Sequence, residues 1–132
     1  MLLRRARGDA YACRVLAEDV GIDDGAIGFH AQQAVEKALK VALVLAEVEL
    51  PRTHDLAQLV ELVLTSATEV PDELSSIEWL TPWAAELRYD EPTTPLDRPA
   101  ALAAAESATD WAAALLGNVQ DLTSINEGAE PK

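Results

Sequence analysis

Residues 28–45, GFHAQQAVEKALKVALVL, decide the class of the fold. Small and apolar residues recur in this stretch every three or four positions, which predicts an amphipathic α-helix over residues 25–48. A polar line runs along the same helix at offsets of three, seven and ten residues, and it consists of His30, Gln33, Lys37 and Lys40. Any bundle helix needs a polar face, but that face does not need a histidine, a glutamine and two lysines in one line. The polar line is therefore either a binding surface or only the solvent-exposed side of the helix.

Helices are also predicted on both sides of this stretch. Residues 2–19 form the first one, because small and apolar residues recur there at helical spacing. A GIDDG break follows, in which Asp23 or Asp24 can cap the central helix. A third helix is expected to start at Thr53, a good N-cap residue, and to run to about residue 67.

The fourth predicted helix contains a proline. It starts at Pro71, and its buried line continues to about residue 87, so Pro82 should cause a kink, or a break after which Thr81 caps the continuation. The segment at residues 89–99 holds three prolines and is expected to be a loop. The last helix is expected over residues 99–119, with Asp97 as its cap.

Short connections between long amphipathic helices predict an all-α fold, an antiparallel up-and-down bundle of four to five helices. We expect the second to fifth helices to form the core, with the first packed alongside. The bundle should occupy residues 1–119 as a single domain, and residues 120–132 should form a flexible tail. The alanines of the last helix permit close approach of another helix, so a homodimer is expected, with no indication of which face it uses.

Composition restricts the class of protein. Hydrophobic residues make up 49% of the chain, which is enough to bury a core. No apolar run approaches the ~20 residues that span a bilayer, and no signal peptide is evident, so we expect a cytoplasmic protein without a membrane partner. The single cysteine, Cys13, permits no internal disulfide and is expected to fill the core.

The net charge of −13 is unevenly distributed. Residues 1–14 carry four arginines and one aspartate, whereas the rest of the chain is strongly acidic. Because duplex phosphates repel so acidic a protein, binding of double-stranded DNA is not expected, and a nucleotide or RNA would need a local basic pocket. The first helix is expected to be solvated, with Arg14 paired to Glu18 four residues later.

Motifs for metals and common cofactors are missing from the sequence. It contains no glycine-rich phosphate loop, no HExxH and no CxxC, and two histidines with one cysteine are too few for a dedicated zinc site. Glu36 is followed three residues later by Leu39, so the Glu-x-x-His pattern of di-iron bundles is not met. No metal and no other cofactor is expected.

Six polar residues near predicted helix ends form the candidate ligand-binding site: His30, Gln33, Lys37, His54, Arg88 and Tyr89. Some have an ordinary structural interpretation as well, because His54 falls in the first turn of a helix, Arg88 is a cation at a helix end and Tyr89 can cover the core. If the bundle places the second helix beside the end of the fourth, His30, Gln33 and Lys37 would face Arg88. Such a cluster could bind a phosphate-bearing ligand.

Three segments together resemble the HEPN domain (higher eukaryotes and prokaryotes nucleotide-binding): FHAQQAVEKALKVAL, LPRTHDLAQLVELV and ELRYDEP. The resemblance covers most of the chain. It implies a four- or five-helix up-and-down bundle that often forms homodimers. It also implies an association with a minimal nucleotidyltransferase partner and either nucleotide binding or the ribonuclease activity of a toxin.

One departure from the family pattern concerns catalysis. Ribonuclease members carry an arginine followed four to six residues later by a histidine, but Arg88 is followed by YDEPTTPLD. In-line RNA cleavage needs a base or acid as well as a cation on the phosphate. The expected function is therefore a HEPN-type module that binds a nucleotide or a nucleotidyltransferase partner without catalysis. A ribonuclease toxin of a toxin–antitoxin pair and a purely structural dimerisation bundle are the alternatives.

Overall fold

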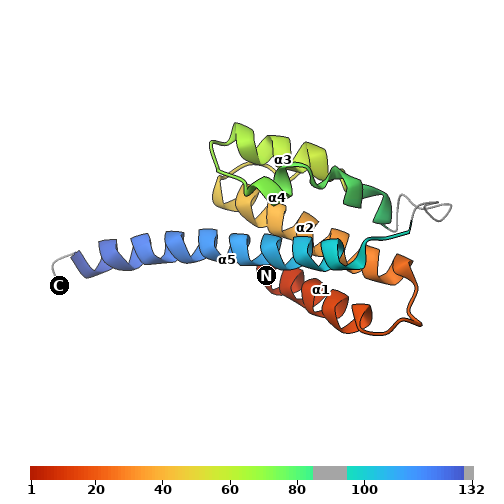
Figure 1. Ribbon diagram of the computed structural model, residues 1–132. Coiled ribbons are helices and arrows are strands. Elements are labelled where there is room, and N and C mark those ends of the chain that lie inside the picture. Colours follow the sequence, from red (N-terminus) through yellow and green to blue (C-terminus); the bar gives the residue numbers. More distant parts are fainter. Residues whose placement is uncertain (85–94, 130–132) are drawn as a thin grey trace.

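The computed structural model describes residues 1–84 and 95–129, with side chains described up to Val119 in the last helix. The described residues form helices and no strand, which confirms the all-α prediction (Figure 1). The elements are, in chain order, α1 (Leu2–Ala17), α2 (Asp24–Leu45), α3 (Leu56–Thr65), α4 (Asp72–Ser75), the 3-10 helix η1 (Ile77–Trp83) and α5 (Arg98–Ala129). No helix of the described part is long and apolar enough to cross a membrane.

The central helix is α2, which packs against α1, α3, η1 and α5. Figure 1 shows α5 running along the bundle, with α1 on one side of it and α3 and α4 on the other. The expectation that α1 only lies alongside the core is wrong, because its contact with α2 is the most extensive between any two elements and Ala6, Ala10 and Cys13 are buried in it. Burial raises the pKa of the Cys13 thiol to about 11, with a smaller contribution from the charge of Glu106.

The predicted apolar faces are the buried ones. Along α2 they include Ile27, Ala31, Ala34, Val35, Ala38, Leu39 and Ala42. Along α5, Ala101, Ala104 and Ala108 are buried. The small size of these residues lets the three long helices approach each other closely, as helical spacing of alanine allows.

Two helix starts depend on aspartates. Asp97 Oδ1 accepts a hydrogen bond of 3.0 Å from the backbone N–H of Ala100, so the predicted cap of α5 is confirmed. At α3 the prediction of Thr53 as cap is wrong by two residues. Asp55 accepts from the N–H groups of Ala57 and Gln58, while Thr53 Oγ1 accepts from the N–H of Asp55 and orders the turn before the helix.

The segment around Pro82 is broken, but not where it was expected to be. α4 ends at Ser75, and the backbone changes direction at Ser76 before η1 begins. Pro82 lies inside η1, whose tighter 3-10 turns need no α-helical N–H at that position. Thr81 does not cap a new helix, because its hydroxyl accepts the N–H of Leu56 at 3.1 Å and thereby joins η1 to the start of α3.

An ion pair fixes the start of α5 against the α1–α2 turn. Arg98 Nε lies 2.8 Å from Asp24 Oδ1, and Arg98 Nη2 donates to the carbonyl of Ile22. The bond from Arg98 and a second one from the N–H of Leu96 hold the pKa of Asp24 below its ordinary value. The predicted pair between Arg14 and Glu18 is wrong, because Arg14 instead reaches Glu106 on α5 at 2.5 Å.

Gly28 is needed where η1 crosses α2. A Cβ atom at this position would lie 2.6 Å from the indole ring of Trp83, a distance that real Cβ contacts do not show. Gly28 is buried and Trp83 is 6% exposed, so neither group can move away freely.

We therefore expect Gly28→Ala to lower the stability of the fold by about 1–3 kcal/mol, the usual cost of overpacking a core. The matched control is Gly8→Ala in α1, where a Cβ meets nothing within 4 Å. That change should stabilise the helix by roughly 0.5–1 kcal/mol. Thermal unfolding followed by circular dichroism measures both, and equal stabilisation by the two substitutions would show that Trp83 does not pack on Gly28.

Candidate functional site

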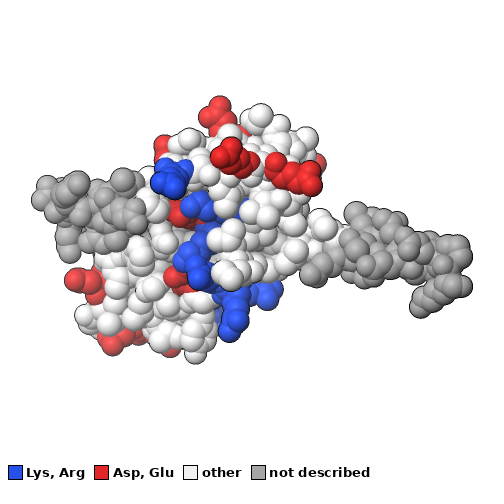
Figure 2. Space-filling model, turned by 180° about the vertical axis from the view of Figure 1, so that it is seen from behind, with Lys and Arg blue, Asp and Glu red and all other residues white. Residues whose placement is uncertain are grey.

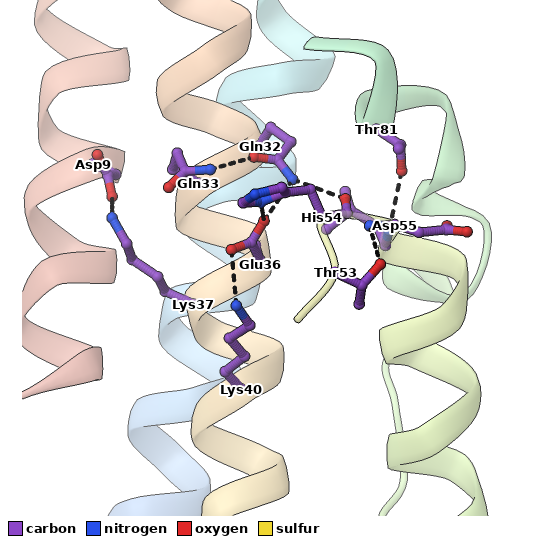
Figure 3. A network of polar contacts seen from close by, with 11 residues as sticks. Asp9, Gln32, Gln33, Glu36, Lys37, Lys40, Thr53, His54, Asp55 and Thr81 are labelled. Carbon is purple, nitrogen blue, oxygen red and sulfur yellow. Dashed lines mark hydrogen bonds and ion pairs between the residues drawn. The ribbon is translucent and has the colours of Figure 1, made fainter. Parts of the chain in front are cut away.

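The polar line of α2 lies in the gap between α1 and α3, on the side of α2 away from α5 (Figure 3). His30, Gln33, Lys37 and Lys40 are all half-buried rather than fully exposed. Neighbouring helices therefore supply partners to these side chains. The polar line is more than the solvent-exposed side of a bundle helix.

Asp9 of α1 gathers two of the predicted site residues. Its Oδ1 lies 2.9 Å from His30 Nδ1, and its Oδ2 accepts a hydrogen bond of 2.5 Å from Lys37 Nζ. The Asp9 side chain is only 13% exposed, which reduces solvent screening of the pair. These contacts attach α1 to the polar face of α2.

Glu36 forms the second centre of the site. Its Oε1 lies 2.6 Å from His54 Nδ1 and accepts a bond of 3.0 Å from Gln32 Nε2, and its Oε2 accepts a bond of 3.1 Å from Lys40 Nζ. Gln32 also donates to the backbone carbonyl of His54 at 3.2 Å. The residue preceding the cap of α3 is thus bound to α2 through both its side chain and its main chain.

The two carboxylates belong to one connected surface. Gln33 Nε2 donates to Gln32 Oε1 at 2.7 Å and so lies between the Asp9 pair and the Glu36 group (Figure 3). The structure therefore brings His30, Gln33, Lys37 and His54 to one face, although His54 and Lys37 are held by different carboxylates. Arg88 and Tyr89 lie outside the described residues.

The ionisation of Glu36 depends on its partners. Glu36 is 4% exposed, and burial by itself raises the pKa of its carboxyl. The hydrogen bonds from Gln32, His54 and Lys40, together with the charge of Lys40, outweigh burial and hold that pKa below its ordinary value. Glu36 is therefore a carboxylate at neutral pH, and His54 Nδ1 is the donor of their bond.

Cations gather on the same side of the protein. Figure 2, seen from the side opposite to α5, shows lysine and arginine side chains in a band across the middle of the face, with acidic side chains mainly toward its rim. Lys37 and Lys40 belong to this side of α2. Arg5 lies one helical turn before Asp9 on α1 and is exposed, as is Arg52 just before His54.

The carboxylate and ammonium charges within the site cancel. Asp9 and Glu36 balance Lys37 and Lys40. A phosphate would therefore be bound by exposed arginines at the edge of the site and by lysine N–H groups that the carboxylates leave unused, since an ammonium has three donors. Within the described part of the chain, no group of three or more histidine, cysteine, aspartate or glutamate side chains could hold a metal ion.

Three residues of the network escaped the sequence analysis as site residues: Asp9, Gln32 and Glu36. A signal for two of them was present, because Gln32, Glu36 and Lys40 follow each other at intervals of four and share a helix face. The sequence carried no comparable signal for Asp9, because Asp9 contacts His30 and Lys37, which lie 21 and 28 positions further along the chain. Only the packing of α1 on α2 brings it into reach.

Glu36→Gln should lower the free energy of unfolding at pH 7 by roughly 1–3 kcal/mol, because it removes an ionised acceptor from three donors. The pKa of Glu36 is lowered in the fold, so its contribution is present above the ordinary value of 4.5 and is lost as the pH falls through the lowered folded value. Urea unfolding at several pH values should show the difference between wild type and variant shrinking in acid. Glu61→Gln, at an exposed site on α3, is the control, and a pH-independent difference would contradict this assignment.

Comparison with protein families gives one result for this chain. The model of the HEPN domain matches residues 1–121, which includes α1 to α4, η1 and most of α5. No match is found among the curated proteins or the solved structures. The resemblance inferred from the polar line of α2, the turn before α3 and the segment after η1 is therefore confirmed. The chain belongs to the HEPN domain family.

Proposed function

We propose that this protein is a non-catalytic HEPN module that binds a nucleotide through its phosphates, on the face formed by α1, α2 and the entry to α3. Membership of the HEPN family supports a nucleotide-related or ribonuclease-like role. The observation that carries the proposal is the band of cations on one face of a protein whose net charge is −13. Such a band raises the local concentration of an anion that the rest of the surface repels.

The roles of the lysines follow from their contacts, and those of the arginines from their positions in the sequence. Lys37 and Lys40 are held in place by Asp9 and Glu36, so little side-chain entropy remains to be lost when a phosphate approaches. Arg52 and Arg88 would supply the charge that these carboxylates do not neutralise. A minimal nucleotidyltransferase is the protein partner we propose, because its association with HEPN modules is what the family resemblance implies.

A ribonuclease remains the second candidate function, and one observation favours it. Glu36 binds Nδ1 of His54 at 2.6 Å, and a carboxylate on one ring nitrogen orients an imidazole for proton transfer at the other. Against this candidate stands the sequence, in which no histidine follows Arg88 at the spacing of the ribonuclease members. Cleavage would need Arg88 as the cation and His54 as the acid or base.

Titration with ATP tests the proposal. Wild type should bind ATP weakly and with a strong salt dependence, and Arg88→Ala or Lys37→Gln should weaken binding at least tenfold, since a charge-assisted contact contributes about 1.5–3 kcal/mol. His54→Ala should have a smaller effect. The matched control is Arg14→Ala, which removes the same charge from a side chain that contacts Glu106 on α5, away from the polar line of α2.

A short single-stranded RNA in the same assay separates the two candidate functions. Cleavage that requires both Arg88 and His54 would favour the ribonuclease over the binding module. No measurable ATP binding by wild type, or equal losses in Arg14→Ala and Lys37→Gln, would refute the proposed nucleotide site. Circular dichroism of each variant checks that helicity is retained.

A further inference from the structure

A groove separates α1 from α5, the two helices that Figure 1 shows side by side. The groove holds about 180 Å³, and we call it the α1–α5 groove. Two of its lining residues, Ala10 and Thr109, are buried and form its floor. α5 continues to Ala129, ten residues past the end expected from the sequence, so the groove lies along the first half of this helix and both of its walls are regular helices.

The two walls of the groove carry opposite charges. The α1 wall presents Arg7 and Arg14. The α5 wall presents Glu106 and Asp110. Arg14 pairs with Glu106 across the groove, but both side chains are partly exposed, so this pair contributes little and can be exchanged for other partners. The exposed side chains of Arg7 and Asp110 form no hydrogen bond or ion pair with any residue that the structure describes. The groove therefore offers an unpaired cation on one wall and an unpaired anion on the other.

Exposed apolar side chains adjoin these charges. Tyr11 lines the groove and is 68% exposed, and Val15, four residues later on the same face of α1, is 48% exposed. Gly8 leaves the surface beside Tyr11 open, because a Cβ there would meet nothing within 4 Å. Tyr11 also lies between two arginines of the α1 wall, at offsets of four and three residues. A tyrosine flanked by arginines is typical of the centre of a protein–protein interface.

The carboxylates of the α5 wall favour a protein over a nucleic acid as the occupant. Phosphates that reached the arginines would also meet Glu106 and Asp110, and beyond them the surface of a protein with a net charge of −13. A protein helix can carry acidic side chains along one edge and basic side chains along the other, so it can match both walls at once. Apolar side chains between the two edges would cover Tyr11 and Val15.

We propose that the α1–α5 groove is a docking surface for an amphipathic helix of another protein. Acidic side chains along one edge of that helix bind the arginines of the α1 wall, and basic side chains along its other edge bind the carboxylates of the α5 wall. The apolar stripe between the edges packs on Tyr11 and Val15. This surface is separate from the face assigned to phosphate binding, because Asp9, two residues before Tyr11, points toward α2 instead.

A synthetic helical peptide tests this assignment. The probe, called the bipolar peptide, carries a stripe of leucines with glutamates along one edge and lysines along the other. A second peptide keeps the leucines and carries glutamates along both edges. Fluorescence anisotropy at physiological salt should show that wild type binds the bipolar peptide about tenfold more tightly, because the carboxylates of the α5 wall repel the all-glutamate peptide. Tyr11→Ala should weaken binding of the bipolar peptide by about tenfold, as for a central interface aromatic residue.

A charge reversal in the groove should change the preference between the two peptides. Asp110→Arg places a cation on the α5 wall, so this variant should lose the preference for the bipolar peptide and bind the all-glutamate peptide more tightly than wild type does. Glu61→Arg is the matched control, because it changes the net charge by the same amount at an exposed site on α3. The control should keep the preference of wild type. All three substituted side chains are exposed, so the variants should keep the helicity and melting behaviour of wild type.

Several results would overturn the proposal. Wild type might not bind the bipolar peptide, the binding might survive Tyr11→Ala, or Asp110→Arg and Glu61→Arg might change the preference equally. Binding of a short single-stranded RNA that requires both Arg7 and Tyr11 would identify a nucleic acid as the occupant instead. Self-association of wild type that Tyr11→Ala abolishes would identify a second copy of this chain. Because ATP binding is measured separately on the α1–α2–α3 face, failure here does not affect the proposed function.

Discussion

A buried carboxylate on α2 determines how α3 is attached to the protein. Glu36 is 4% exposed and can remain ionised there only because Gln32, His54 and Lys40 donate hydrogen bonds to it. His54 precedes the cap of α3, and the first N–H of α3 is bound by Thr81 of η1. A continuous set of short contacts therefore leads from α2 through the entry of α3 to η1. Removing the carboxylate would leave one buried donor, Gln32, and two partly buried donors, His54 and Lys40, without their acceptor.

The same contacts shape the face that we assign to ligand binding. Asp9 and Glu36 hold Lys37 and Lys40 in fixed positions, and they also cancel much of the charge of the lysines. Such a site favours a ligand that forms additional hydrogen bonds with these lysines over a ligand that must first break their bonds to Asp9 and Glu36. Exposed arginines around it, such as Arg52, provide attraction at longer range. This combination suits weak, salt-sensitive binding of a phosphate group.

Much of the fold could be predicted from the sequence because helical periodicity is local. The spacing of small residues in α2 identified its buried face, and Asp97 was recognised as a cap from its position alone. Where contacts are non-local the predictions failed. Arg14 had an acceptor four residues away in Glu18, yet the packing of α1 on α5 offers it Glu106 instead. Helix boundaries were also displaced, since Thr53 and Asp55 are both suitable caps and only the backbone turn selects between them.

The candidate site was predicted in part, for the same reason. His30, Gln33 and Lys37 were identified because they share one line on one helix. Their partner Asp9 could not be assigned, because its role depends on how α1 is placed along α2. Glu36 was considered only as a metal ligand, although its interval of four to both Gln32 and Lys40 indicated a hydrogen-bonded group. The burial that makes Glu36 important is a property of the whole bundle.

The coupling free energy between Glu36 and His54 tests most directly whether the buried carboxylate attaches α3 to α2. A double-mutant cycle with Glu36→Gln, His54→Asn and the double variant, each unfolded in urea at pH 7, isolates the interaction from the effects of the single changes. We predict a coupling free energy of about 1–3 kcal/mol, as expected for a short, charge-assisted and partly buried hydrogen bond. Effects that simply add, within about 0.5 kcal/mol, would contradict the claim that this contact attaches α3 to α2.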